Sequence, residues 1–166
     1  MRRGRLRTVR ERGLWLILKL VSRSAALCAA LAVAAPFAEA GTGPATIRIT
    51  NVQTKATTVD LGARGRSPGD LEIIAQSLYN TRVTQQPIGH ADILCTLLAK
   101  TSQSCTATYE LPKGRIVTNG VISSRLIYEV AITGGTELYD NARGSLVVTT
   151  TALSPRRQVL LFRLTG

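Results

Sequence analysis

Short runs in which apolar and polar residues alternate dominate the chain after Gly41, and no stretch there has a convincing helical period. In residues 45–52, isoleucine and valine alternate with threonine and arginine. A period of two is typical of a β-strand with one buried face. The pattern therefore predicts a first strand over residues 45–52, continuing irregularly through residues 57–61.

Seven more β-rich runs follow, separated by segments rich in Gly, Pro and Ser. They cover residues 71–78, 91–98, 105–111, 115–122, 126–133, 145–151 and 158–164. Eight strands in sequential hairpin order, with no helix to cover a face, hide their apolar side chains most economically by closing on themselves. We therefore predict an all-β fold, an eight-stranded antiparallel β-barrel, with a two-sheet sandwich as the alternative.

The interior of such a barrel bears on function. Eight strands enclose a core that is either filled by side chains or leaves room for one small ligand. The chain has only two Phe, and its single Trp lies before residue 41, which argues against an interior packed solid with aromatic rings.

The first forty residues have the composition of an export signal. Six arginines lie between Arg2 and Arg12, an alanine-rich run follows, and Ala38-Glu39-Ala40 is a small-x-small cleavage pattern. We therefore expect a cleaved signal peptide over residues 1–40, a single barrel domain over residues 41–166, and a secreted, extracellular protein. The alternative is a membrane anchor over residues 14–38, although Lys19 and Arg23 would be costly in hydrocarbon.

The charge of the chain changes when that segment is set aside. The whole chain has 21 Lys and Arg against ten Asp and Glu, a net charge of +11. Residues 41–166 contain 13 Lys and Arg and eight Asp and Glu, which gives a net charge of +5. The remaining basic residues form no dense run and are not interleaved with aromatic residues, so we expect no nucleic-acid partner.

Two cysteines remain after residue 40, Cys95 and Cys105. In an exported chain an even number of cysteines favours a disulfide, and a hairpin turning at residues 100–102 would bring the two within bridging reach. Two buried free thiols are the alternative. A metal site is not indicated, because His90 is the only histidine and the cysteine spacing fits no zinc pattern.

Residues 132–144 form the segment richest in turn residues. Gly134 and Gly135 are expected to permit positive φ, Asp140-Asn141 to bond its own backbone, and Gly144 to allow a close approach of two segments. Glu137, Asp140 and Arg143 place three charges near one strand end. This segment is the first candidate for a site.

Several motifs, taken in order over residues 69–151, resemble the allene oxide cyclase and dirigent superfamily of eight-stranded antiparallel barrels. The cyclase-like segments are Gly69-Asp70-Leu71 with Leu78-Tyr79, Ile88-Gly89 with Leu94-Cys95, Ala107-Thr108-Tyr109, and Val117 to Gly120. The dirigent-like segments are Thr133-Gly134-Gly135-Thr136 and Ala142-Arg143-Gly144. In the cyclases, a first-strand carboxylate and the cysteine matched by Cys95 are implicated in ring closure. Residues 45–52 contain no Asp or Glu, so that carboxylate has no counterpart there.

Dirigent proteins use the arginine of the Ala-Arg-Gly segment, with acidic residues near the glycine turn, around a pocket for a reactive phenolic species. The resemblance thus assigns tentative catalytic roles to Arg143 and Glu137, and ligand-binding roles to Asp70, Tyr79 and Asp140. A carboxylate beside a guanidinium can orient an oxygenated ligand or exchange a proton with it. The alternative is a solvated ion pair that fixes the loop. Asp70 and Tyr79 are as easily structural, the first at the start of a strand and the second at a barrel end.

The sequence therefore predicts an exported small β-barrel that binds a small hydrophobic or phenolic ligand. It would steer cyclisation or coupling of that ligand without a cofactor, as a cyclase, isomerase or dirigent-type protein does. The alternative function is that of a non-enzymatic secreted structural or interaction barrel. We expect no membrane association after signal cleavage, and a homo-oligomer, a trimer by analogy with dirigent-type relatives.

Overall fold

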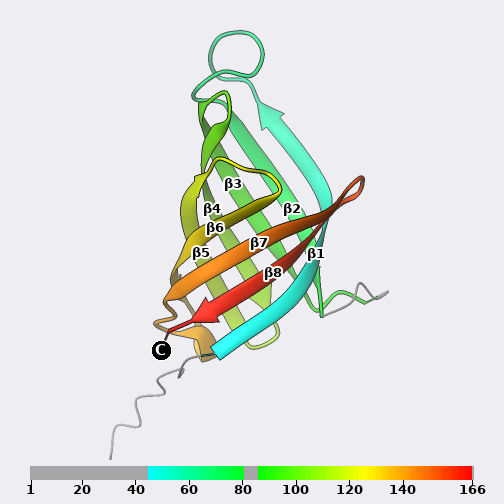
Figure 1. The fold of residues 1–166 in the computed structure, drawn as a ribbon, viewed down its shortest axis with the longest axis vertical. Coiled ribbons are helices and arrows are strands. Elements are labelled where there is room, and N and C mark those ends of the chain that lie inside the picture. The colour runs from blue at the N-terminus through cyan, green and yellow to red at the C-terminus, as the bar shows by residue number, and fades with distance from the viewer. Residues whose placement is uncertain (1–44, 81–85, 166) are drawn as a thin grey trace, which may run out of the picture. The chain divides into compact units, whose positions relative to one another are not determined.

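The computed structural model describes residues 45–80 and 86–165, and within them it forms a closed eight-stranded antiparallel barrel (Figure 1). The expected signal peptide, residues 1–40, lies outside the described residues. The strands are β1 Ala45–Val59, β2 Leu71–Tyr79, β3 Gly89–Ala99, β4 Ser102–Leu111, β5 Gly114–Ile122, β6 Ile127–Gly135, β7 Gly144–Leu153 and β8 Arg156–Leu164. One 3-10 helix, η1 Glu137–Tyr139, lies between β6 and β7. No helix within the described part of the chain is long and apolar enough to cross a membrane.

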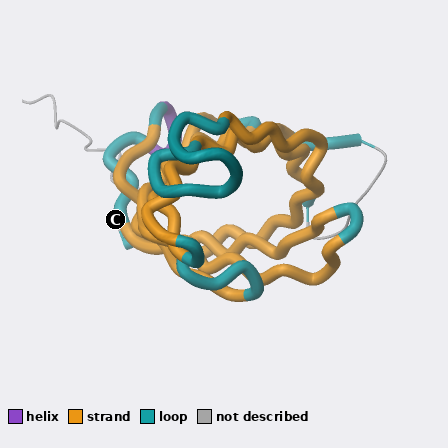
Figure 2. The backbone as a smooth tube through the Cα atoms, turned by 90° about the horizontal axis from the view of Figure 1, so that it is seen from above, coloured by secondary structure: helices purple, strands orange, loops and turns teal. Residues whose placement is uncertain are grey.

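The strands pair in chain order and β1 also pairs with β8, which closes the ring seen from above in Figure 2. The barrel predicted from the sequence is confirmed, and the two-sheet sandwich is wrong. The strands of the barrel begin and end close to the residues expected from the sequence. The main difference is in β1, which continues without interruption to Val59 because a bulge between Gln53 and Lys55 restores its pairing with β2.

The four hairpin turns at one end of the barrel join β1 to β2, β3 to β4, β5 to β6 and β7 to β8. We call this the disulfide end, because Cys95 and Cys105 lie near it. The other end carries the β4–β5 turn and the β6–β7 connection with η1, and we call it the η1 end.

Side chains fill the half of the barrel toward the η1 end. Phe162, Leu78, Ile116 and Leu146 have no solvent-exposed surface, and the ring of Tyr109 meets that of Phe162 edge to face at 5.1 Å. Such close packing is typical of a protein core. A site inside the barrel therefore has to lie toward the disulfide end.

Two pairs of neighbouring strands lose contact toward the disulfide end. The β1–β8 ladder ends at the pair Val52 and Arg157, although β1 continues for seven residues. The β5–β6 ladder ends at the pair Asn119 and Ala131. The barrel wall is thus less tightly joined at this end than at the other.

Candidate functional site

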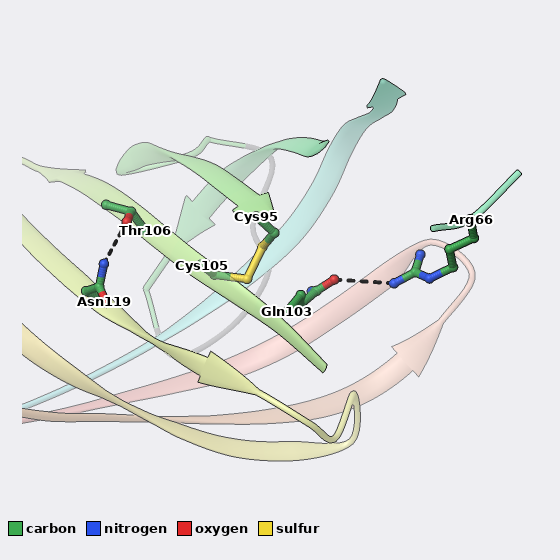
Figure 3. The surroundings of a disulfide bond; sticks show 6 residues. All are labelled: Arg66, Cys95, Gln103, Cys105, Thr106 and Asn119. Atoms are coloured by element: carbon green, nitrogen blue, oxygen red, sulfur yellow. Dashed lines mark hydrogen bonds between the residues drawn. A yellow bond between two sulfur atoms is a disulfide. The ribbon is translucent and has the colours of Figure 1, made fainter. Parts of the chain in front are cut away.

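Cys95 on β3 and Cys105 on β4 are directly paired across the two strands and form a disulfide with an S–S distance of 2.04 Å (Figure 3). Their Cα atoms are 4.1 Å apart. Both residues are buried, at 2% and 4% exposure, and belong to the inward-facing set. The disulfide predicted from the sequence is confirmed in the structure, and Cys95 forms part of the wall of a pocket.

This pocket lies inside the disulfide end and has a volume of about 30 Å³, the space of about one water molecule. Its apolar wall consists of Ile74, Ile93, Ile122 and Cys95. Its polar lining consists of Gln76, Gln103, Gln158, Tyr128, Arg125 and Arg156. The structure thus places amide, phenol and guanidinium groups around a cavity that is also lined by isoleucine side chains.

Gln76 and Gln158, which line the pocket, belong to a cluster of three buried amides from three strands, and Asn51 is its third member. Asn51 Nδ2 donates to Gln76 Oε1 at 2.6 Å and to Gln158 Oε1 at 2.9 Å. Gln76 Nε2 also donates to Gln158 Oε1, at 3.3 Å. The Oδ1 atom of Asn51 is buried and has no hydrogen-bond partner among the described residues. A buried polar atom without a partner lowers the stability of the fold. Core packing alone therefore does not explain why this cluster is present.

Tyr128 on β6 brings a phenol group to the same pocket. Burial raises its pKa, while a hydrogen bond with the Gln158 side chain and the charge of Arg156 act in the opposite direction. The hydroxyl is therefore neutral at physiological pH and available as a hydrogen-bond donor.

A larger groove of about 410 Å³ adjoins the pocket at the rim of the barrel. Gln103, Ile122 and Arg125 line both the pocket and the groove, so these three side chains separate two adjoining spaces. The groove is completed by Arg66, Lys100, Thr101 and Ser123. In Figure 3, Arg66 of the β1–β2 loop points toward Gln103 of β4, and its Nη2 atom lies 3.4 Å from Gln103 Oε1.

Two acidic residues lie near this rim. Asp70 accepts hydrogen bonds from the backbone N–H groups of Ser67, at 2.6 Å, and Leu61, at 3.1 Å. These bonds, chiefly the one from Ser67, lower the pKa of its carboxyl. Asp70 thus holds the β1–β2 loop, as the structural alternative predicted. Glu72 is half-buried, shares the inward face of β2 with Ile74 and Gln76, and lies beside Arg66 and Gln103.

The residues of the β6–β7 connection lie at the η1 end. Glu137, Asp140 and Arg143 come together in one loop, and all three are exposed. Arg143 Nη1 donates to the carbonyl oxygens of Thr133 and Ala142, both at 2.9 Å. Within the described residues, no ion pair joins Glu137 to Arg143. The arrangement therefore fixes the loop through backbone carbonyls, and Arg143 does not lie on the inner wall.

Gly134 and Gly135 do not have the positive φ that was expected for them. Positive φ is found at Glu137 and Asn141. Gly135 is instead required by a close approach, since a Cβ there would lie 2.2 Å from Tyr139 O. Gly144 combines a φ of 133° with a close approach to Arg163 O, as its predicted role requires. Asn141 N donates to Asp140 Oδ1 at 3.0 Å, which confirms the expected local turn.

The candidate residues suggested by the sequence are not brought into one place. Asp70 is at the disulfide end, Glu137, Asp140 and Arg143 are at the η1 end, and Tyr79 is the last residue of β2. Because Leu78 points inward, Tyr79 points to the outer face, where it is half-buried. Sequence reasoning missed Asn51, Gln76 and Gln158. Their signal was present, because each puts an amide two residues from a buried Ile or Leu on the inward face of its strand.

A second, more apolar pocket of about 540 Å³ lies at the η1 end. Its wall includes Ile47, Pro112, Leu138, Tyr139 and Leu164, with Lys113 as its charged member. Burial raises the pKa of Tyr139. The two ends of the barrel therefore differ in chemistry, one rich in amides and cations and the other aliphatic.

Solved structures of several barrel proteins resemble this one. Pyocyanin demethylase matches with a TM-score of 0.61 and 25% identity, over 71% of this chain and 100% of that chain. The Diels-Alderase AbmU from Streptomyces koyangensis matches with a TM-score of 0.56 and 13% identity, over 76% of this chain and 72% of that one. The pterocarpan synthase dirigent protein PsPTS1 matches with a TM-score of 0.57 and 14% identity, over 74% and 94%.

Comparison with protein-family models gives no match, and comparison with curated proteins gives none either. The structural matches show that the chain has the same barrel fold as a Diels-Alderase and a dirigent protein, which agrees with the fold that the sequence motifs imply.

Proposed function

We propose that this protein is an exported β-barrel that binds a small hydrophobic or phenolic ligand at its disulfide end and steers cyclisation or coupling of that ligand without a cofactor. The observation that carries the proposal is the amide cluster of Asn51, Gln76 and Gln158, inward-facing and buried in a barrel whose other half is packed with apolar side chains. Polar groups in such a position are costly for folding alone, and they are the groups that fix the orientation of a ligand in an apolar pocket.

The pocket is built to bind an oxygen atom rather than to remove a proton. Tyr128, Arg125 and Arg156 present N–H and O–H donors to it, and Glu72 at the rim is the nearby acid. Donors fixed in advance stabilise negative charge as it develops on a carbonyl or phenol oxygen. The aliphatic wall of Ile74, Ile93 and Ile122 would meanwhile restrict the conformation of the apolar part. Positioning and charge stabilisation of this kind can steer the ring closure of a reactive ligand, or the coupling of phenolic species that have already been oxidised elsewhere.

A ligand needs more room than the 30 Å³ of the closed pocket. The side chains between pocket and solvent are long ones, Gln103, Arg125 and Arg156, and Arg125 is exposed. Rotation of these side chains joins the pocket to the groove without moving a strand. Binding therefore involves opening of the rim, and the ligand lies partly inside the barrel and partly in the groove.

The neighbouring structures support the proposal through the small molecules that their names mention. One is a demethylase of pyocyanin, one a Diels-Alderase and one a pterocarpan synthase of the dirigent type. The disulfide supports export, since oxidising compartments are where such bonds persist. Secretion is tested by mass spectrometry of the protein recovered outside the cell, where we expect an N-terminus at Gly41.

The binding proposal is tested with the purified protein and a panel of phenolics and lipid epoxides. We expect at least one of them to raise the melting temperature of the native protein. Ile122→Trp, which fills the pocket from its wall, should abolish the shift. Val121→Trp is the matched control, because Val121 is the adjacent residue and is 56% exposed. A panel that leaves the melting temperature unchanged, or equal binding by both variants, would contradict the proposal.

The second candidate function is that of a non-enzymatic interaction barrel. It is favoured by Ile73 on β2 and Leu94 on β3, a directly paired set on the outer wall that is 48% and 49% exposed. Adjacent apolar residues on a surface mark contact sites for other proteins, including further copies of the same chain. Light scattering tests for the homo-oligomer expected by analogy. If Ile73→Lys dissociates an oligomer and Ile122→Trp leaves every binding property intact, the interaction function is favoured.

A further inference from the structure

We propose that the groove at the rim of the disulfide end is a subsite for an anionic group, a carboxylate, sulfonate or phosphate, carried by the ligand whose apolar part enters the barrel. This inference rests on the proposed function and narrows its ligand to a molecule with an aromatic or aliphatic body and a negatively charged substituent.

The cations of the groove come from three separate turns. Arg66 lies in the β1–β2 loop, Lys100 in the β3–β4 turn and Arg125 in the β5–β6 connection. Arg156, at the start of β8, adds a fourth positive charge in the adjoining pocket. Each turn is remote from the others in the sequence, and closure of the barrel brings them to one rim. Like charges gathered around a concave surface repel one another and raise the local concentration of anions.

These cations are not neutralised by neighbouring carboxylates. Within residues 45–80 and 86–165, none of the recorded ion pairs involves Arg66, Lys100 or Arg125. Arg66 has only a long hydrogen bond, 3.4 Å, to an amide oxygen. Asp70 and Glu72 are the two acids beside the groove, against the four cations Arg66, Lys100, Arg125 and Arg156. The positive charge of the rim therefore exceeds the negative charge that faces it.

The groove also has donors that match the shape of an anion. Thr101 and Ser123 supply hydroxyl groups, and Arg66 and Arg125 supply planar guanidinium groups. Guanidinium groups bind carboxylates and phosphates through two parallel hydrogen bonds. With a volume of about 410 Å³, the groove has room for such a group and for part of the ligand body.

The residues shared by the groove and the pocket place the anion relative to the rest of the ligand. Arg125 lines both spaces, as do Gln103 and Ile122, so an apolar body at Ile122 has its charged substituent within reach of Arg125. The η1 end offers a contrast. Its pocket is larger, at about 540 Å³, but Lys113 is the one charged residue in its lining. Anion binding is thus expected at the disulfide end.

The test compares two fluorescent probes that differ by one charged group. 8-Anilino-1-naphthalenesulfonate carries a sulfonate, and N-phenyl-1-naphthylamine has the same aromatic body without it. The double variant Arg66→Gln/Lys100→Gln removes two groove cations, neither of which lines the interior pocket. Arg48→Gln/Arg163→Gln is the matched control, because both arginines are exposed on the outer wall and the change in net charge is the same.

We expect the native protein to bind the sulfonate at least about fivefold more tightly than the neutral probe, as weakly screened charge pairs allow. This preference should disappear in the groove variant and remain in the control. It should also fall as NaCl is raised from about 0.02 M to about 0.5 M, because salt screens exposed charges.

Other outcomes separate this inference from the proposed function. Equal binding of the two probes by the native protein would overturn the anion subsite and leave the ligand-binding barrel in place. Loss of the preference in the control as well would also overturn it, since net charge would then suffice. Binding of neither probe would count against the proposed function itself. Displacement of the sulfonate by about 1 mM inorganic phosphate, with the neutral probe retained, would overturn the assignment to a ligand-borne group and indicate a free-anion site.

Discussion

Asn51 on β1 donates a 2.9 Å hydrogen bond from Nδ2 to Oε1 of Gln158 on β8, and these two strands are the ones at which the barrel closes. The two residues are also direct partners in the β1–β8 ladder. One amide contact thus joins the closure of the fold to the lining of the proposed ligand pocket.

Replacing Asn51 by Ala should lower the free energy of unfolding by about 2 kcal/mol, because Gln76 Oε1 loses the donor Asn51 and Gln158 Oε1 keeps only the longer bond from Gln76, while both oxygens stay buried. Urea denaturation measures the change. Asn119→Ala is the control, since the exposed Asn119 bonds only to Thr106, and it should stay within about 0.5 kcal/mol of the native protein. Equal stability of the two variants would show that the amide cluster contributes nothing to the fold.

Removing the disulfide by the double change Cys95→Ala/Cys105→Ala should cost about 2–3 kcal/mol, because the bond constrains a short loop in the unfolded chain. The two cysteines are ten residues apart in the sequence. The melting temperature of the native protein should fall when a reductant is added, whereas that of the double variant should not respond. A native protein insensitive to reductant, with two titratable thiols after denaturation, would mean that the bond is not formed.

Stability should decrease at alkaline pH because of the buried tyrosines. Burial raises the pKa of Tyr109, Tyr128 and Tyr139 in the folded protein. Above about pH 10, the unfolded chain loses these protons and the folded protein keeps them, so unfolding becomes more favourable. The contribution of these protonated tyrosines to the free energy of unfolding is fully present below about pH 10 and is lost as the pH rises above that value.

Tyr109→Phe tests this linkage, because Tyr109 is buried and has a hydrogen bond with Thr118. The variant should be about 1 kcal/mol less stable at pH 7, where the hydrogen bond is missed. Its stability should then fall less steeply above pH 10, by at most about 1.4 kcal/mol per pH unit. Below pH 9 the two proteins should show the same pH dependence. A difference in slope in that range would point to another titrating group.

Arg143→Ala separates the resemblance-based catalytic role of Arg143 from the structural one. Because its guanidinium holds the carbonyl oxygens of Thr133 and Ala142, we expect a loss of about 1 kcal/mol in stability. Binding of the neutral naphthylamine probe at the other end of the barrel should not change. Arg163→Ala, on the outer wall of β8, is the control for removal of an exposed arginine. Lost ligand binding or activity at unchanged stability would instead support a direct role of Arg143.

The strands and the disulfide were accessible from the sequence because both depend on local patterns. Alternation in residues 91–98 and 105–111 sets which side chains face inward, and a short turn between them sets the register that pairs Cys95 with Cys105. The close approach at Gly144 likewise followed from the residue type.

The candidate site was not accessible in the same way. Gln76 and Gln158 are 82 residues apart and meet only because β1 pairs with both β2 and β8. Arg66, Lys100 and Arg125 belong to different turns, and each alone is an ordinary exposed cation. Glu137, Asp140 and Arg143 formed a candidate site in the sequence because they are close along the chain, yet all three are solvent-exposed around a backbone turn.

The packed half of the barrel has a kinetic consequence. With Phe162, Tyr109 and Ile116 filling the space toward η1, the interior is a cup that is blind at one end. A molecule that enters at the rim of the disulfide end has to leave by the same route. Release of one molecule and entry of the next therefore compete for one opening. A long ligand cannot thread through the barrel, and any length beyond the depth of the cup remains outside.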